Sequence, residues 1–381
     1  MLHHSRQLPE DARAALARVG LVSDKGTGRP HSIKTQGGSW ILLAASPKLS
    51  AAGGAVLGRR RGVPWAAKER IDLSTVSLQT LETQASEAVG SKVVAAGLRI
   101  GPGGRSKLAV ALVDRSFQPK AIAKFPLTDL AQDSLIREVE AITSLRRIGG
   151  LSSHLPELLA EPELAGHRGI LVAAGPPERV RSVGEEVISF LHDLHELTTA
   201  PTGLNVNTVS ISWLDLLERR RDLLSRRQAS ILDSAIRYVA DSLGEARLPN
   251  TTAHGDFTRW NLRVGDQGLF VFDWEASFDQ ALPYHDLFHF FAAESALRRR
   301  PSPTTGWTWR RVSSLAASIA PDQVPLLGPL YVGYLVHTTL WYSRSLTWRA
   351  DDRPGPFWQF LWSELAPTSR RFRATNRQSL F

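Results

Sequence analysis

The sequence predicts an α+β chain made of two parts, a small antiparallel β part with one helix followed by a larger, mostly helical part. Short strand-like runs flank a glycine-rich turn between residues 93 and 113, and a third run follows at 121–125. Residues 129–148 have the apolar spacing of a helix with one buried face. After residue 183 helical spacing dominates, so the second part is expected to be built mainly from helices.

The predicted boundaries divide the chain into three regions. Residues 1–90 are expected to be an N-terminal extension packed on the small part, with a regulatory or partner-docking segment as the alternative. Residues 91–175 form the small part and residues 176–381 the large part. The run Gly175-Pro176-Pro177 is typical of a hinge between them.

Composition excludes several classes of site. The chain has 381 residues, of which 43% are hydrophobic and 22% charged, as in ordinary globular proteins. It has no cysteine, which excludes disulfides, thiolate metal sites and a cysteine nucleophile. No apolar run is long enough for a signal core or a membrane span, so a cytoplasmic location is expected. The net charge of +9 comes with scattered arginine clusters, and nucleic acid is therefore not expected as the main partner. The cluster at 219–221 falls on the solvated face of a predicted helix whose apolar side carries Trp213, Leu216, Leu217 and Leu223.

The small part begins with a predicted hairpin suited to holding phosphate. Val93–Ile100 is the first strand and Leu108–Val113 the returning one. The turn between them contains Gly103, Gly104 and Ser106. Glycine lets backbone amides approach phosphate oxygens closely, so these three residues are candidates for nucleotide binding. Most glycine turns between strands are only turns, and the signal is weak by itself.

A lysine and a glutamate stand where they can form a buried pair. Lys124 interrupts the apolar run 121–125, and an unpaired buried ammonium is costly. In the helix 129–148, Glu138 lies on the apolar face. That face is marked by Leu135, Val139, Ile142 and Leu145. Lys124 and Glu138 fit the strand-lysine and helix-glutamate pair that positions nucleotide phosphates. The alternative is an edge lysine and a solvated glutamate.

The most informative residues lie between positions 254 and 275. The run begins His254-Gly255-Asp256, Asn261 follows five residues after Asp256, and Asp273 follows twelve residues after Asn261. A hairpin of Asn261–Val264 and Leu269–Phe272 would bring these groups to one place. A carboxylate that accepts the proton of an attacking hydroxyl, followed by an amide and a carboxylate that hold magnesium, is the set that phosphoryl transfer needs.

This pattern resembles the aminoglycoside phosphotransferase and choline kinase-like family, whose usual sequence motif is His-Gly-Asp, four residues, Asn, and then Asp-Trp-Glu after the hairpin. Two positions depart from it, because Arg259 stands in place of the usual proline and Trp260 in place of a small residue. Glu275 completes the Asp-Trp-Glu run. Asp286 matches the family's later Asp-Leu and is expected to brace the catalytic loop.

The resemblance covers roughly residues 91–300 and implies a protein-kinase-like two-lobed fold. It also implies ATP or GTP with Mg²⁺, and transfer of the γ-phosphoryl group to a hydroxyl of a small molecule. In these terms Asp256 is the proton acceptor, His254 braces the loop, and Asn261 and Asp273 hold the metal. A protein substrate is disfavoured, since only twelve residues separate Asp273 from Asp286. Two alternatives stay open: a catalytically inactive nucleotide-binding or scaffold module, and a basic surface-binding protein.

The resemblance implies that the residues from Ala276 onward form the wall of the acceptor site. They include seven Asp and Glu against twelve Arg and no Lys, together with six of the eleven tryptophans. A polycationic acceptor would be repelled by such a wall, whereas tryptophan faces and arginines suit a sugar ring or an anion. We therefore expect a neutral or anionic hydroxylated acceptor, with the alternative that many of these tryptophans are core residues.

Overall fold

The structure is a computed structural model, and it describes residues 32–35, 38–42, 75–100, 107–116, 118–164, 167–298, 302–304, 306–343 and 355–378. The chain divides into two compact units. Unit 1 holds the described residues up to Ser144 together with Leu155–Pro176, and unit 2 holds Leu145–His154 together with the described residues from Pro177 onward.

Unit 1 contains a seven-stranded antiparallel sheet in the order β1-β2-β3-β4-β5-β9-β6. The strands are β1 (Ser32–Thr35), β2 (Gly38–Leu42), β3 (Val94–Ile100), β4 (Lys107–Val113), β5 (Pro119–Pro126), β6 (Leu158–Ala160) and β9 (Ile170–Ala173). A separate pair is formed by β7 (Glu163–Leu164) and β8 (His167–Arg168). In the sheet Lys124 of β5 is paired with Ala109 on one side and Ile170 on the other. Lys124 is therefore held by strands on both sides.

Two helices accompany this sheet. Helix α4 (Asp129–Arg146) is the predicted helix, ending two residues earlier than residue 148. Helix α3 (Thr75–Val89) was not predicted, although its buried Leu81 and Ala85 are spaced as on one helix face. These two side chains belong to the core of the sheet, where Phe125 is also fully buried. Residues 75–89 thus contribute to the core of unit 1.

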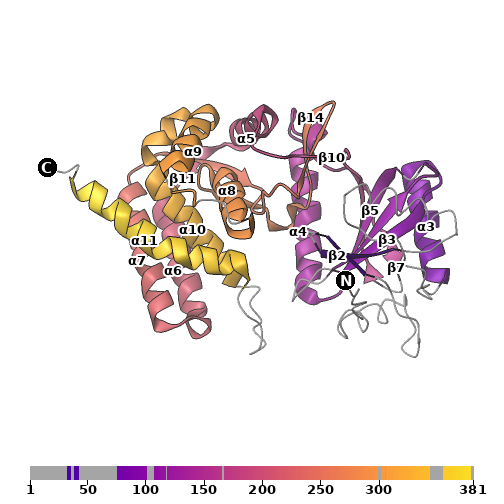
Figure 1. The fold of residues 1–381 in the computed structure, drawn as a ribbon, viewed down its shortest axis with the longest axis horizontal. Coiled ribbons are helices and arrows are strands. Elements are labelled where there is room, and N and C mark those ends of the chain that lie inside the picture. Colours follow the sequence, from indigo (N-terminus) through magenta and orange to yellow (C-terminus); the bar gives the residue numbers. More distant parts are fainter. Residues whose placement is uncertain are drawn as a thin grey trace, which may run out of the picture. The chain divides into compact units, whose positions relative to one another are not determined.

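Unit 2 is mostly helical. Its helices are α5 (Glu185–Thr198), α6 (Val206–Arg219), α7 (Arg226–Leu243), α8 (His285–Arg298), α9 (Gly306–Ile319), α10 (Leu327–Ser343) and α11 (Pro356–Gln378). Helix α10 is buried on nearly every side and packs against α6, α7, α8 and α11 (Figure 1). One correction concerns the helix that carries Trp213. It ends at Arg219, and Leu223, expected on its apolar side, lies in the 3-10 helix η2 (Arg221–Leu223) with 44% of its surface exposed.

Short strands and turns complete unit 2. One small sheet consists of β11 (Ala200–Leu204), β12 (Leu248–Ala253) and β15 (Phe278–Ala281), and another of β10 (Glu178–Arg179), β13 (Leu262–Gly265) and β14 (Gly268–Val271). The remaining 3-10 helices are η1 (Ser152–His154), η3 (Trp274–Ala276) and η4 (Pro321–Leu326). Among the described helices, none combines the length and apolar character that a membrane span requires.

Candidate active site

The β13–β14 hairpin brings the two predicted metal ligands to the same end. Leu262 pairs with Val271, and the two-residue turn closes where Gly265 pairs with Gly268, whose φ is +92°. Beyond the open end, the amide of Phe272 donates to the carbonyl of Asn261 at 3.1 Å. Asn261 therefore stands opposite Phe272, directly beside Asp273.

The loop before this hairpin is anchored from below by Asp286 of α8. The amide of His254 donates to Asp286 Oδ2 at 2.8 Å, and that of Gly255 donates to Oδ1 at 3.0 Å. Gly255 has φ +77°, and a Cβ there would collide with the carbonyl oxygen of Ala276. Only glycine suits this position. Burial raises the pKa of Asp286, against the lowering effect of His254 and the two amides.

His254 is fully buried and has both ring nitrogens engaged. The amide of Asp256 donates to Nδ1 at 3.1 Å, so Nδ1 is unprotonated. Nε2 then carries the proton and donates it to the carbonyl of Phe272 at 3.2 Å. The ring also packs edge-on against Trp274, with centroids 4.7 Å apart. This geometry suits a residue that joins the loop to the hairpin and leaves no nitrogen for proton transfer.

Asp256 is the accessible carboxylate of the loop, with 32% of its side chain exposed. Asn261 Nδ2 donates to its Oδ2 at 3.0 Å and to its backbone carbonyl at 3.0 Å. Its Oδ1 lies 3.2 Å from Nε2 of His289, a residue of α8 that the sequence analysis did not single out. Both oxygens of Asp256 are therefore held in place.

Asn261 and Asp273 carry oxygen atoms of the kind that Mg²⁺ prefers. Because Asn261 uses Nδ2 toward Asp256, its Oδ1 faces elsewhere, and no described residue donates to that oxygen. Asp273 is half-buried and has the left-handed backbone φ 71°, ψ 55°. Such strain in a non-glycine residue is often found at functional sites. In the described residues no three acidic or histidine side chains form a closed metal cage, and Mg²⁺ shared with substrate phosphates needs only one or two such ligands.

The structure describes both residues that depart from the family's usual sequence motif, Arg259 and Trp260. Arg259 Nη2 donates to the carbonyls of Val180 and Arg181, at 3.2 and 2.5 Å, and its Nε lies 3.7 Å from Glu294 Oε1. Arg259 thereby ties the loop to the chain after β10 and to α8. Trp260 is half-buried, and its carbonyl accepts a hydrogen bond from Arg263.

The other predicted site residues lie in unit 1 or near the hairpin. Lys124 Nζ is 2.6 Å from Glu138 Oε1, and the two side chains are 11% and 0% exposed. Glu138 Oε2 is buried and has no hydrogen-bond partner among the described residues. Glu275 is half-buried in η3. The glycine turn with Gly103, Gly104 and Ser106 lies outside the described residues.

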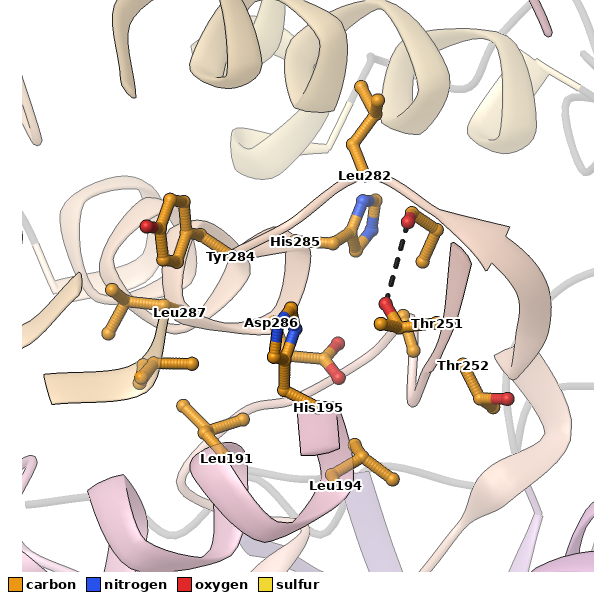
Figure 2. A pocket seen from close by; sticks show the side chains of 13 residues that line it. Leu191, Leu194, His195, Thr251, Thr252, Leu282, Tyr284, His285, Asp286 and Leu287 are labelled. Atoms are coloured by element: carbon orange, nitrogen blue, oxygen red, sulfur yellow. Dashed lines mark hydrogen bonds between the residues drawn. The ribbon is translucent and has the colours of Figure 1, made fainter. Parts of the chain in front are cut away.

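A small cavity of about 30 Å³ adjoins the bracing residues (Figure 2). His195 and Leu191 of α5 face it from one side, while Thr251 of β12 and Asp286 contribute to its wall. Burial lowers the pKa of His195, which keeps this imidazole neutral. The volume has room for roughly one or two water molecules and is too small for a nucleotide or a sugar.

The tryptophans after Ala276 divide into groups. Trp358 is a core residue, 7% exposed, and packs edge-on against Trp362. Trp309 and Trp341 are half-buried, and the ring of Trp309 lies against Tyr331. The Trp307 side chain and Trp348 lie outside the described part of the chain.

Comparison with known proteins places the chain among phosphotransferases. Residues 97–307 match the model of the family described as phosphotransferase enzyme family. A search of curated proteins gives no match.

The matching solved structures include aminoglycoside phosphotransferases and a putative fructosamine-3-kinase. A thermostable mutant of aminoglycoside phosphotransferase APH(4)-Ia, in a ternary complex with ADP and hygromycin B, is 12% identical, with a TM-score of 0.51 over 76% of this chain and 98% of that chain. ADP-bound aminoglycoside phosphotransferase APH(2'')-Ib is 14% identical, covering 78% and 98%, with a TM-score of 0.48. A putative fructosamine-3-kinase from Haemophilus somnus 129PT is 13% identical, covering 75% and 97%, with a TM-score of 0.47. The predicted α+β, protein-kinase-like fold class is confirmed.

Proposed function

We propose that this chain, which belongs to the phosphotransferase enzyme family, moves the γ-phosphoryl group of ATP or GTP to a hydroxyl of a small neutral or anionic acceptor, with Mg²⁺ as the metal. Family membership makes it a phosphotransferase that acts on small molecules. What we propose beyond family membership is the identity of the nucleotide and metal, the roles of the individual site residues, and the class of acceptor.

The observation that carries the proposal is the arrangement around Asp256. This carboxylate is accessible, and hydrogen bonds from Asn261 and His289 fix the direction of its two oxygens. A hydroxyl placed against it gives its proton to the carboxylate while its oxygen bonds to the γ-phosphorus. The bond between that phosphorus and the bridging β–γ oxygen breaks, and the nucleoside diphosphate leaves with the electron pair. His254 has no free nitrogen for this work and remains a bracing residue.

The remaining groups fit the nucleotide and its metal. Asn261 Oδ1 and the Asp273 carboxylate would hold Mg²⁺, which when bound neutralises charge on the phosphates. Lys124, oriented by Glu138, supplies an ammonium for phosphate oxygens. Gly103, Gly104 and Ser106 are proposed to supply amides and a hydroxyl from the glycine turn. The need for ATP or GTP favours a cytoplasmic location, and the scattered arginines disfavour nucleic acid as the main partner.

The acceptor class follows from how the acidic side chains after Ala276 are used. Four of the five that the structure describes already have polar partners, namely Asp279 with Thr252, Asp286 with the loop amides, Glu294 with Arg259, and Glu364 with Ser302. A cluster of ammonium groups is best held by several carboxylates that have no other polar partner in the protein. The described residues of this region offer few such carboxylates, which favours a neutral or anionic acceptor such as a sugar or a sugar acid.

A panel of acceptors tests this proposal. Wild-type protein and an Asp256→Asn variant are incubated with Mg²⁺, labelled ATP or GTP, and either sugars, sugar acids or polycationic aminoglycosides. We expect transfer to a member of the first two groups by the wild type only. Efficient and selective turnover of the polycations would contradict the acceptor class, and equal turnover by the Asp256→Asn variant would contradict the assigned base.

A further inference from the structure

His289 lies in direct reach of the proposed base. It is 1% exposed, stands on α8 one turn after Asp286, and places Nε2 3.2 Å from Asp256 Oδ1. The other oxygen of Asp256 accepts from Asn261 Nδ2 at 3.0 Å. A carboxylate held at only one oxygen can turn about its Cβ–Cγ bond, whereas one held at both has a defined plane.

The partners of His289 determine which of its nitrogens carries the proton. An ionised Asp256 can only accept, so Nε2 of His289 must be the donor. In a neutral imidazole Nδ1 is then an acceptor, and the hydroxyl of Tyr334 lies 3.4 Å away from it. Tyr334 is fully buried, and burial raises the pKa of its hydroxyl well above the usual value. Tyr334 therefore keeps its proton and can donate it to Nδ1.

We propose that His289 is a positioning residue that fixes the plane of the Asp256 carboxylate, and that Tyr334 selects the tautomer of His289 that can do so. The hydrogen bonds run from the Tyr334 hydroxyl to His289 Nδ1, and from His289 Nε2 to Asp256 Oδ1. With Oδ1 and Oδ2 both held, the free lone pairs of the carboxylate are aimed in a fixed direction. This inference rests on the proposed function, in which Asp256 receives the proton of the acceptor hydroxyl.

A purely structural role is the competing explanation, because aromatic rings surround His289. The ring of Phe357 lies 5.3 Å away between centroids, and that of His285 lies 6.5 Å away. His285 is a useful control, since it is on the same helix, one turn earlier, and is 3% exposed. In the described residues its side chain makes no hydrogen bond to Asp256. Loss of packing should therefore lower the melting temperature when either histidine is replaced, whereas loss of positioning should lower kcat only when His289 is replaced.

The first experiment compares steady-state kinetics of His289→Leu, His289→Gln and His285→Leu, with melting temperatures for each. A hydrogen bond to a charged group is worth roughly 10- to 100-fold in an equilibrium or rate, so His289→Leu is expected to lose about that much in kcat with little change in the acceptor KM. Glutamine keeps an N–H that can reach Asp256, and His289→Gln should recover most of the loss. His285→Leu should melt earlier but keep a kcat near the wild-type value.

The second experiment follows the proton by ¹⁵N NMR on protein labelled at histidine, with the His289 signals assigned from the His289→Gln spectrum. We expect a neutral ring protonated at Nε2. Tyr334→Phe should shift the Nδ1 signal, and Asp256→Asn should shift the Nε2 signal. Tyr331→Phe is the matched control, because Tyr331 is equally buried on α10 and its hydroxyl lies near Glu364 instead of His289.

The outcomes separate the two proposals. If the wild type transfers phosphate but His289→Leu keeps its kcat, the inference fails and the proposed function stands. If no acceptor is phosphorylated by the wild type, the proposed function fails, and the NMR result still decides whether the hydrogen-bonded chain exists. A His289 ring protonated at Nδ1, or one whose signals ignore Asp256→Asn, would overturn the inference.

Discussion

Replacing Asp286 tests how the loop at residues 254–261 is held. Its two carboxylate oxygens accept the amides of His254 and Gly255, at 2.8 and 3.0 Å, and the side chain is buried. In Asp286→Ala both amides lose their acceptor. In Asp286→Asn one oxygen remains and can still accept one amide, while the side-chain NH₂ faces the other. We therefore expect both variants to lose stability and activity, the alanine variant more than the asparagine variant.

The size of the effect follows from these contacts. A buried donor left without an acceptor costs about 1–3 kcal/mol, so Asp286→Ala should lower the free energy of unfolding by about 2–6 kcal/mol. That is a large share of the roughly 5–15 kcal/mol that holds a domain together. The asparagine variant loses one bond and also avoids burying a charge, the effect that raises the pKa of Asp286. Its loss should be about 1–3 kcal/mol.

Urea unfolding followed by circular dichroism, with turnover measured on the same samples, checks this order. Asp279→Asn is the control, because Asp279 is exposed and accepts a single side-chain hydrogen bond from Thr252. It should change the free energy of unfolding by less than about 1 kcal/mol. Wild-type stability in Asp286→Ala would show that the two amide bonds do not hold the loop.

Three further predictions concern charged groups. Lys124→Ala should lower the free energy of unfolding by about 3–5 kcal/mol, since it leaves buried Glu138 without its cation, and it should also lower turnover. A double variant Lys124→Met, Glu138→Leu that recovers both the melting temperature and turnover would refute the proposed role of Lys124 in binding phosphate. Asp273→Asn should keep the melting temperature but lose Mg²⁺-dependent nucleotide binding, measured by calorimetry. Burial lowers the pKa of His285 well below its usual ~6.5, so the unfolded chain binds more protons below that pH, and stability should fall as the pH drops from about 7 to 5. Urea titrations at both pH values check this, and His285→Gln should reduce the difference.

Local sequence patterns were sufficient to predict the loop at residues 254–261 and the hairpin that follows it. The interval between Asp256 and Asn261, and the alternating strands that follow, depend on contacts only a few residues apart. The contact of Lys124 with Glu138 also follows from local rules, because each residue's face is set by the period of its own strand or helix. Their roles in catalysis stay predictions.

The contact of His289 with Asp256 could not be predicted in this way. Helix α8 is buried on most sides, so its residues show no polar face, and a histidine among phenylalanines is usually a core residue. The two residues meet only because α8 packs beneath the loop, 33 positions along the chain. The sequence does contain one clue to this contact. Because Asp286 is expected to brace the loop, His289, three positions later on the same face of the helix, is expected to lie near the loop as well. Helix α3 was missed because Ser, Thr, Gln and Glu make up most of residues 75–89, so the helical spacing of Leu81 and Ala85 gives only a weak apolar pattern.

The most direct test of phosphoryl transfer by this site is a ³¹P NMR time course with ATP, Mg²⁺ and the best acceptor from the panel. The wild type should produce a phosphomonoester of the acceptor in an amount equal to the ADP formed. Asp256→Asn should still bind nucleotide but form that product roughly 10²–10⁴ times more slowly. Formation of ADP and inorganic phosphate alone, or an unchanged rate in Asp256→Asn, would contradict the account.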